Sequence, residues 1–386
     1  MKILIFDLQI TGHHSEYIEH LIDYIDLQSS NEYVFVVNPK LKDNFPNIHI
    51  KGANKSNILW VFIGNDELNL ILGSNVILRS LREVEIIKKY ASIYKIDHVL
   101  AMYFNTLQIG MGINKKLNFT ISGILFLQFT RMRKKSVSER FKYLRKYFVT
   151  NLYSRNKSIK YIYILNDNKA VQKFNDLFHT SIFKMLPDPV PQIEEEAHFN
   201  LKEYFQIENK RSVLLMFGAL SERKGTIESI EALNFINEED LKKISLLIVG
   251  SASDSFHLKI SAAISQIQKK SLNASIYYYR DFVSNSRMKS IFNQSDIILL
   301  PYKNAEASSG ILGHAIASKK IVIASGNGLI KDIVEENNLG LLVNPITAME
   351  IGNKISEVLG IYKTYNIKSL SYISSHSPEK FVEILF

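Results

Sequence analysis

The stretch Pro301–Pro345, PYKNAEASSGILGHAIASKKIVIASGNGLIKDIVEENNLGLLVNP, follows an apolar run, Asp296–Leu300, that predicts a buried strand. Small residues then open a helix predicted at Ser308–Ser318, and a second apolar run, Ile321–Ala324, predicts the next strand. A helix start presents unpaired amide N–H groups and a positive dipole end, which together suit a phosphate. Glu306 would repel a phosphate but could accept hydrogen bonds from sugar hydroxyls. The stretch therefore predicts either a phosphate and sugar site or a plain α/β crossover with a surface Glu.

Apolar runs and helical segments alternate along the rest of the chain, and this alternation predicts parallel sheets with helices on both faces. Helices are predicted at Val76–Tyr94 and, after the capping residue Asp167, at Asn168–Leu177. Strands are predicted at 2–6, 33–37, 59–63, 98–102, 123–127 and 161–165 in the first half, and at 213–217, 246–250, 275–279, 296–300 and 321–324 in the second.

Length and composition narrow the class of protein. At 386 residues the chain predicts two domains, and three prolines within 187–191 predict the linker between them. The chain has no cysteine, which excludes disulfides and fits a cytosolic protein. No window approaches the roughly 18 to 20 apolar residues of a membrane span, and the start MKILIFDLQI becomes polar too soon for a signal peptide. We expect a cytoplasmic α/β protein with domains at 1–187 and 192–373.

Two loops that follow predicted strands carry candidate binding residues. The first contains Gly12, His13 and His14, and ligands bind at such strand ends in open α/β sheets. Either His could instead be a cap or turn residue. In the second loop, Arg223 and Lys224 stand just before a predicted helix start. Cations oppose the helix dipole there, so a bound anion would explain them.

The second half carries short motifs in a fixed order: G-x-L-x-x-x-K-G at 218–225, L-L-I-V-G at 246–250, D-F-V at 281–283, D-I-I-L-L-P-Y at 296–302, E-x7-H at 306–314 and G-L-L-V at 340–343. In this order they resemble the retaining glycosyltransferases of family 4, which have the two-domain GT-B fold. The resemblance covers nearly all of the second half, whereas the first half matches only in layout. Two positions depart from the family: His314 replaces a second Glu, and Ala219 replaces an Arg, with Arg223 beside Lys224 instead.

The resemblance implies an α/β protein of the GT-B type, in which two Rossmann-like doubly wound domains face each other across a cleft and a terminal helix, 374–386, crosses back to the first domain. In the family, the residues at Arg223 and Lys224 stabilise the leaving nucleoside diphosphate, and the Glu at 306 contacts the donor sugar. Gln128 stands where many members have a His, and with His13 it is a candidate contact for the acceptor. The remaining candidates for binding the donor are Gly12, His14, Gly218, Asp281, Phe282, Val283, Ser308, Ser309, Gly310, Ile311, Leu312 and His314.

The activity that the resemblance implies is transfer of a sugar, with retention, from a nucleoside-diphosphate sugar such as a UDP-sugar to a glycan or lipid-linked acceptor in bacterial surface polysaccharide synthesis. No metal and no further cofactor is expected. Two alternatives stay open. A sugar-nucleotide epimerase of the same fold would need acid and base carboxylates in the cleft, and a non-catalytic partner subunit would explain why His314 breaks the Glu pair. Nucleic-acid binding is not expected, because no nucleic-acid module accompanies the basic residues.

The segment Arg131–Lys160 contains eleven Lys and Arg residues and one acidic residue, in a chain of net charge +9. A local excess of this size predicts a local anionic partner. Five apolar residues of the segment share one narrow stripe of a helix: Val137, Phe141, Leu144, Phe148 and Leu152. The stripe predicts a helix packed on the first domain's sheet with a solvated basic back. A further hypothesis is that the segment docks on the inner face of a bacterial membrane, beside a lipid-diphosphate-linked acceptor, through Arg133, Lys134, Lys142 and Lys146.

Overall fold

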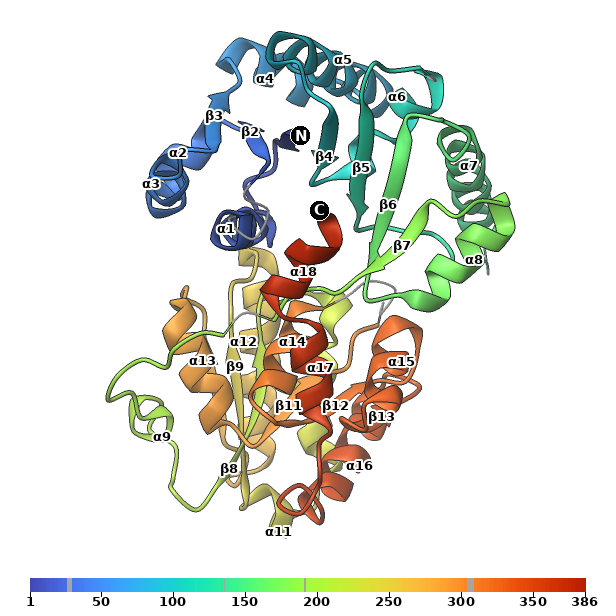
Figure 1. Cartoon of the computed structure of the whole chain (residues 1–386). Helices are drawn as coiled ribbons and strands as arrows, with labels where there is room; N and C mark the ends of the chain where they lie inside the picture. Colours follow the sequence, from blue (N-terminus) through green and yellow to red (C-terminus); the bar gives the residue numbers. More distant parts are fainter. Residues whose placement is uncertain (26–29, 115, 133, 135, 191, 304–308) are drawn as a thin grey trace. The chain divides into compact units, whose positions relative to one another are not determined.

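A computed structural model describes residues 1–25, 30–114, 116–132, 134, 136–190, 192–303 and 309–386. These residues form two compact units: unit 1 comprises Met1–Pro187 and Pro378–Phe386, and unit 2 comprises Asp188–Ser377. In both units, parallel strands alternate with helices along the chain (Figure 1).

Unit 1, over the residues that are described, contains a sheet of seven parallel strands in the order β3-β2-β1-β4-β5-β6-β7. The strands are β1 (Lys2–Asp7), β2 (Glu32–Val37), β3 (Ile58–Phe62), β4 (His98–Ala101), β5 (Thr120–Leu125), β6 (Ile159–Leu165) and β7 (Phe183–Leu186). The helices are α1 (His14–Tyr24), α2 (Lys40–Asn44), α3 (Pro46–Ala53), α4 (Asn65–Leu72), α5 (Val76–Tyr94), η2 (Phe104–Thr106), α6 (Gln108–Ile113), α7 (Val137–Tyr153), α8 (Asn168–Phe178) and α18 (Pro378–Leu385).

Successive side chains of a strand point to opposite faces of a sheet. Both faces of this sheet are apolar, and helices cover both. In β1, Leu4 and Phe6 join one apolar cluster, whereas Ile3 and Ile5 join the other. The second cluster includes Phe381 of α18, which is fully buried. Helix α18, the red helix at the C label in Figure 1, therefore completes the core of unit 1 although it follows unit 2 in the sequence.

Helix α7 packs on unit 1 through its tyrosines. Tyr153 is fully buried, and Tyr143 and Tyr147 lie partly buried against the core. The five predicted apolar residues, hereafter the α7 stripe, are exposed by 83% at Val137, 70% at Phe141, 50% at Leu144, 59% at Phe148 and 49% at Leu152. The prediction that this stripe packs on the sheet is therefore wrong. At about 100° per residue the tyrosines form a second apolar face opposite the stripe, and that face meets the core.

Unit 2, within its described residues, contains a sheet of six parallel strands in the order β10-β9-β8-β11-β12-β13. The strands are β8 (Ser212–Phe217), β9 (Ile244–Val249), β10 (Ile276–Tyr279), β11 (Ile297–Leu300), β12 (Ile321–Ser325) and β13 (Gly340–Val343). The helices are α9 (Leu201–Tyr204), η3 (Glu222–Lys224), α10 (Thr226–Glu231), η4 (Ala232–Phe235), α11 (Glu238–Leu241), α12 (Asp254–Lys270), α13 (Asn285–Gln294), α14 (Gly310–Ala317), α15 (Gly328–Glu336), α16 (Ala348–Leu359) and α17 (Ser369–Ser375).

Strand β11 shows why this sheet is buried on both faces. Ile298 and Leu300 join one apolar cluster of unit 2, and Ile297 and Leu299 join the other. Such continuous apolar runs are typical of parallel strands covered by helices on both sides. The loops that follow β8, β9 and β11 consequently emerge at the same edge of the sheet.

Among the described residues, no helix is both long enough and apolar enough to cross a membrane.

Candidate functional site

Two glycines bring the loops after β8 and β9 into backbone contact. Gly218 has φ +101° and Gly250 has φ +146°, conformations that favour glycine. The Gly218 amide donates to Val249 O at 2.9 Å. A Cβ atom added to Gly250 would lie 2.0 Å from Gly218 O. Neither position can therefore carry a side chain of its own without a shift, and the two backbones approach closely at this edge of the sheet.

Lys224 fills the space beside Gly218. It is the last residue of η3, is only 7% exposed, and donates to Phe217 O at 3.4 Å. A Cβ atom on Gly218 would lie 2.9 Å from Lys224 Nζ and 3.4 Å from Ile311 Cδ1. The structure thus brings together three residues that the sequence predicted as donor contacts: Gly218, Lys224 and Ile311.

The turn after Lys224 holds the ammonium group inward. Gly225 has φ +70°, and a Cβ atom there would lie 2.3 Å from Pro301 O, so only glycine fits without a shift. The Lys303 amide donates to Arg223 O at 2.8 Å and ties η3 to the segment after β11. Arg223 and Lys224 lie 5.6 and 5.3 Å from the centre of the buried Tyr302 ring. Both predicted cations therefore border one aromatic ring.

The electrostatics of Lys224 favour an anionic ligand. Burial and, secondarily, the neighbouring Arg223 lower the pKa of Lys224 to about 8. Within the described parts of the chain, no carboxylate lies within ion-pair distance of its Nζ atom. Two nearby carboxylates have other partners, since Glu222 pairs with Lys259 at 2.5 Å and Glu228 pairs with Lys303 at 2.5 Å. A phosphate beside Lys224 would restore the charge balance and stabilise the protonated amine.

The N-terminus of α14 adds backbone donors to the same region. Ser309 is its N-cap residue, but no side chain caps the helix. Its first-turn amides, including those of Gly310 and Ile311, are therefore placed to donate to an anion. Ser309 Oγ instead donates to Tyr302 Oη at 3.4 Å. Three predicted site residues lie outside the described residues: Glu306 and Ser308 of this segment, and Arg133 of the predicted membrane-docking set.

Other predicted residues of α14 lie deeper. Leu312 is 1% exposed and packs in the core of unit 2, so only its backbone could meet a ligand. His314 is partly buried, and its ring centre lies 5.8 Å from that of Phe292. Contact between His314 and a ribose stays a prediction.

The loop after β10 holds the residues predicted to bind the nucleotide base. Phe282 is 90% exposed and Asp281 is exposed, whereas Val283 is buried in the core. Arg280, which precedes them, pairs with Asp254 at 2.5 Å. An exposed phenylalanine ring at a strand end could stack on a base, while Val283 could contribute only backbone groups.

In unit 1, His14 is the first residue of α1 and not a loop residue, as the sequence analysis predicted it to be. The imidazole is 6% exposed, and its Nδ1 atom lies 2.8 Å from Oδ2 of the buried Asp7. Its ring stacks on Phe126 at 5.2 Å and meets Tyr103 edge-on at 5.4 Å. Asp7 is the last residue of β1, while Tyr103 and Phe126 follow β4 and β5, and the strand order reverses between β1 and β4. The sequence analysis missed them, although Asp7 ends a predicted strand.

The remaining candidates of unit 1 differ in exposure. Gly12 has φ +72° and is exposed, and the exposed His13 lies 2.9 Å from Glu16. Gln128 is buried, and its side chain accepts hydrogen bonds from Thr130 and donates to Asp167 at 3.3 Å. These bonds hold the loop after β5, so a role of Gln128 toward the acceptor stays a prediction.

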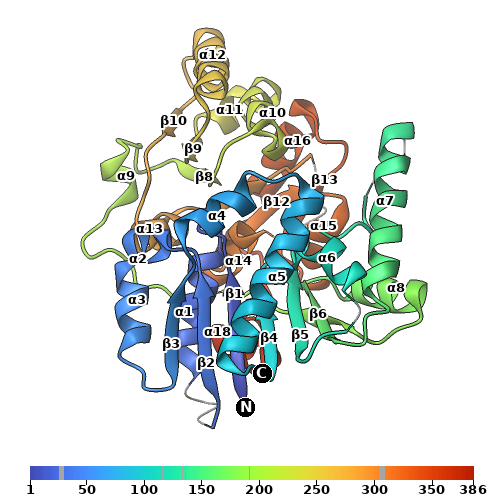
Figure 2. The same ribbon diagram turned by 90° about the horizontal axis from the view of Figure 1, so that it is seen from above.

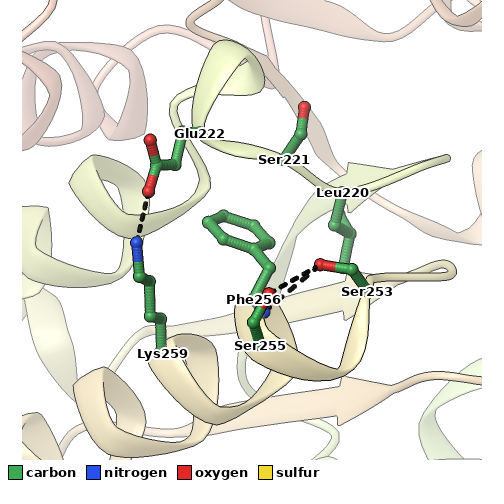
Figure 3. Close-up of a pocket in the computed structure, with 7 residues that line it drawn as sticks. All are labelled: Leu220, Ser221, Glu222, Ser253, Ser255, Phe256 and Lys259. Carbon is green, nitrogen blue, oxygen red and sulfur yellow. Dashed lines mark hydrogen bonds and ion pairs between the residues drawn. The ribbon is translucent and has the colours of Figure 1, made fainter.

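A hollow of about 400 Å³ lies beside η3 (Figure 3). The sticks show the Glu222–Lys259 ion pair on one side and the hydroxyls of Ser253 and Ser255 on another. The lining residues are Leu220, Ser221, Glu222, Ser253, Ser255, Phe256 and Lys259. Because neither Arg223 nor Lys224 lines it, this hollow is not the candidate phosphate site.

Comparison with known proteins also indicates a similarity to glycosyltransferases. Residues 199–367 match the family model described as Glycosyl transferases group 1. Over 174 residues the chain is 25% identical to a lipopolysaccharide 1,2-N-acetylglucosaminetransferase of Salmonella typhimurium, and the match covers 44% of each chain, which is less than half of that relative.

Solved structures match over the whole length. HepE of Anabaena, in complex with UDP, has a TM-score of 0.69 at 15% identity, over 100% of this chain and 98% of that one. A glycosyltransferase of Rickettsia africae has a TM-score of 0.67 at 15% identity, over 100% and 97%. Identities this low bear on the fold alone, and they confirm the predicted α/β fold. The chain thus has the fold of GT-B glycosyltransferase structures, and its residues 199–367 match the Glycosyl transferases group 1 model.

Proposed function

We propose that the protein is a glycosyltransferase of the EC 2.4 class that takes a sugar from a nucleoside-diphosphate sugar, with UDP as the favoured nucleotide. One observation carries the proposal: Lys224 is buried without a carboxylate partner among the described residues, beside Gly218 and the first turn of α14. This arrangement lies within the segment that matches the family model. HepE, which shares the fold, was crystallised with UDP, and this supports the choice of nucleotide.

Negative charge develops on the diphosphate as it leaves the anomeric carbon. Arg223, Lys224 and the first-turn amides of α14 would stabilise that charge, and they are held in place before the reaction begins. Glu306 would orient the donor sugar. We propose retention, in which the acceptor attacks the face from which the diphosphate departs, so that the protein supplies no nucleophile. This set of one amine, one guanidinium and backbone amides would bind the diphosphate without a metal ion.

The acceptor is proposed to be a glycan or a lipid-linked glycan of a bacterial surface polysaccharide, handled on the cytoplasmic side of the membrane. The support is the Salmonella relative, whose name describes a sugar transfer to lipopolysaccharide. In unit 1, the edge at which β1 and β4 lie side by side carries the exposed His13 as a candidate acceptor contact, next to the donor candidate Gly12.

The test begins with a thermal-shift screen of nucleoside diphosphates, followed by assays with sugars of the best base. Lys224→Ala and Arg223→Ala should each lower transfer more than about tenfold, equivalent to about 1.4 kcal/mol of barrier. Nuclear magnetic resonance of the first product reports the anomeric configuration. Conversion of a nucleotide sugar without acceptor would instead indicate an epimerase, and failure to bind any nucleoside diphosphate would indicate a non-catalytic subunit.

A further inference from the structure

The α7 stripe is a row of large apolar side chains that the described residues of unit 1 leave about half exposed or more. All five of its residues are at least 49% exposed, and Val137 and Phe141 reach 83% and 70%. Single exposed apolar residues are ordinary, but a continuous row on one helix marks an interaction surface. Figures 1 and 2 both draw α7 at the outer side of unit 1, together with α8.

The helix that carries the stripe is firmly built. Ser136 and Glu139 form a capping box, in which Glu139 N donates to Ser136 Oγ at 3.1 Å and Ser136 N donates to Glu139 Oε2 at 3.0 Å. On the opposite face, Tyr153 is fully buried in the core of unit 1. The stripe is therefore presented along a fixed helix of 17 residues, about 25 Å long.

Positive charge borders the stripe on both sides. With a rotation of about 100° per residue around the helix axis, Arg140 and Arg145 lie on either side of the stripe, and Lys142 lies further round. All three side chains are exposed. Within the part of the chain that the structure describes, no carboxylate pairs with Lys142 or Arg145. The segment 131–160 contains one acidic residue, Glu139, which takes part in the capping box. The cations thus remain available to an anionic partner.

We propose that α7 docks unit 1 on the surface of a bilayer that contains anionic lipids. The stripe would enter the boundary between headgroups and acyl chains, while the bordering cations contact lipid phosphates. An apolar face between rows of Lys and Arg on a rigid helix is the arrangement of interfacial membrane helices. The inference rests on the proposed function in one respect, because it gives the surface at which a lipid-linked acceptor would be met.

A second copy of the chain is a poorer occupant. Two α7 helices packed stripe to stripe would bring Arg140 and Arg145 of one copy against the same residues of the other. This holds for parallel and antiparallel pairing, since the two residues occupy the positions beside the apolar seam. Repulsion between the borders would oppose such a dimer, whereas an anionic lipid surface attracts every border residue at once.

The experiment measures sedimentation of the full chain with vesicles of equal parts phosphatidylcholine and phosphatidylglycerol, and with vesicles of phosphatidylcholine alone. Wild type should bind the mixed vesicles at low salt and lose most of that binding as salt is raised. Lys142→Glu with Arg145→Glu should weaken binding at least about twentyfold. Phe141→Ser with Phe148→Ser should weaken it at least about tenfold.

Two matched controls test whether a loss of vesicle binding is specific to α7 or follows from any loss of positive charge or of exposed apolar side chains. Lys40→Glu with Lys42→Glu makes the same change of charge on exposed residues of α2. Leu258→Ser with Leu272→Ser removes two exposed apolar side chains of unit 2, which are 67% and 101% exposed. Both controls should bind the mixed vesicles within about twofold of wild type, since a change of a few tenths of a kcal/mol is typical of such surface sites.

A fluorescence measurement tests insertion. The variant F148W should shift its emission to the blue on mixed vesicles and be quenched by brominated acyl chains, beyond the signal of the single native tryptophan, Trp60. Wild-type vesicle binding by both α7 double variants, or no binding by wild type, would refute docking on lipid. A concentration-dependent dimer that Phe141→Ser abolishes would refute it in favour of a second copy. UDP affinity, measured without vesicles, tests the proposed function separately.

Discussion

Titration of Lys224 offers a direct test of the diphosphate site. Burial and Arg223 lower its pKa to about 8 in the free protein. A bound diphosphate would raise that pKa again, because an adjacent negative charge favours the ammonium form. Binding of UDP should therefore take up a proton wherever the free amine is neutral, and UDP affinity should fall as the pH rises above about 8.

The size of this change in UDP affinity follows from the fraction of Lys224 that is protonated at each pH. At about pH 7 roughly nine tenths of the free protein carries the charge at Lys224, and at about pH 9 roughly one tenth does. The dissociation constant of UDP should therefore rise about tenfold over this range, which is about 1.4 kcal/mol of binding free energy. The nucleotide itself contributes little to the change, because the second ionisation of its terminal phosphate lies near about pH 6.

Isothermal titration calorimetry at about pH 8.5, in two buffers of different ionisation enthalpy, should detect an uptake of about three quarters of a proton per UDP. Lys224→Ala should bind weakly with no dependence on pH. Lys224→Arg, which stays charged throughout, should bind without the loss of affinity at high pH. An identical pH dependence in wild type and in both variants, or no proton uptake by wild type, would refute the placement of Lys224 at the diphosphate.

Three further predictions concern single side chains. Glu306→Gln should abolish transfer, measured with a labelled donor, while leaving UDP affinity near wild type; turnover at the wild-type rate would remove Glu306 from the reaction. His314→Ala should raise KM for the donor by less than about tenfold and change kcat little, since one hydrogen bond is at stake. Phe381→Ala should lower the free energy of unfolding of unit 1 by about 3–5 kcal/mol, measured by denaturant titration, because its buried ring would leave a cavity in the core. A loss below about 1 kcal/mol would show that α18 contributes little to that core.

Strands buried on both faces were the easiest elements to predict, because they read as unbroken apolar runs. The predicted strand at 246–250 corresponds to β9 (Ile244–Val249), and the predicted helix at Val76–Tyr94 has the same bounds as α5. Strand β7 was missed, since it has only four residues at the edge of the sheet, and two of them, Lys184 and Met185, are exposed.

The hydrophobic periodicity of α7 did not show which face of the helix packs on unit 1. The spacing identified an amphipathic helix, but Tyr143, Tyr147 and Tyr153 supply a second apolar face with a period of its own. Because both faces carry large side chains at helical spacing, the pattern alone does not say which of them packs on unit 1. Here the tyrosine face packs, and Tyr153 is fully buried.

For the site, residue types were predictable and partners were not. The order of motifs predicted Arg223 and Lys224 as site residues, and the loop position predicted His14. The contact between Lys224 Nζ and Gly218 depends on the left-handed turn at Gly225, and the contact between His14 and Asp7 depends on the first turn of α1. Both are products of backbone geometry at strand ends, where one altered φ angle redirects a side chain.

The place of α18 in unit 1 has a consequence for the order of folding during synthesis. Unit 1 begins to emerge from the ribosome first, but Phe381, Val382 and Leu385 of its core follow all of unit 2. At ordinary translation rates they arrive about 10–40 s after the other strands and helices of the unit. During that interval the apolar face of α1 that packs on α18 is open to chaperones or to other nascent chains. A chain released before residue 378 would keep this face uncovered, so truncation products should aggregate through unit 1 even when unit 2 is fully formed.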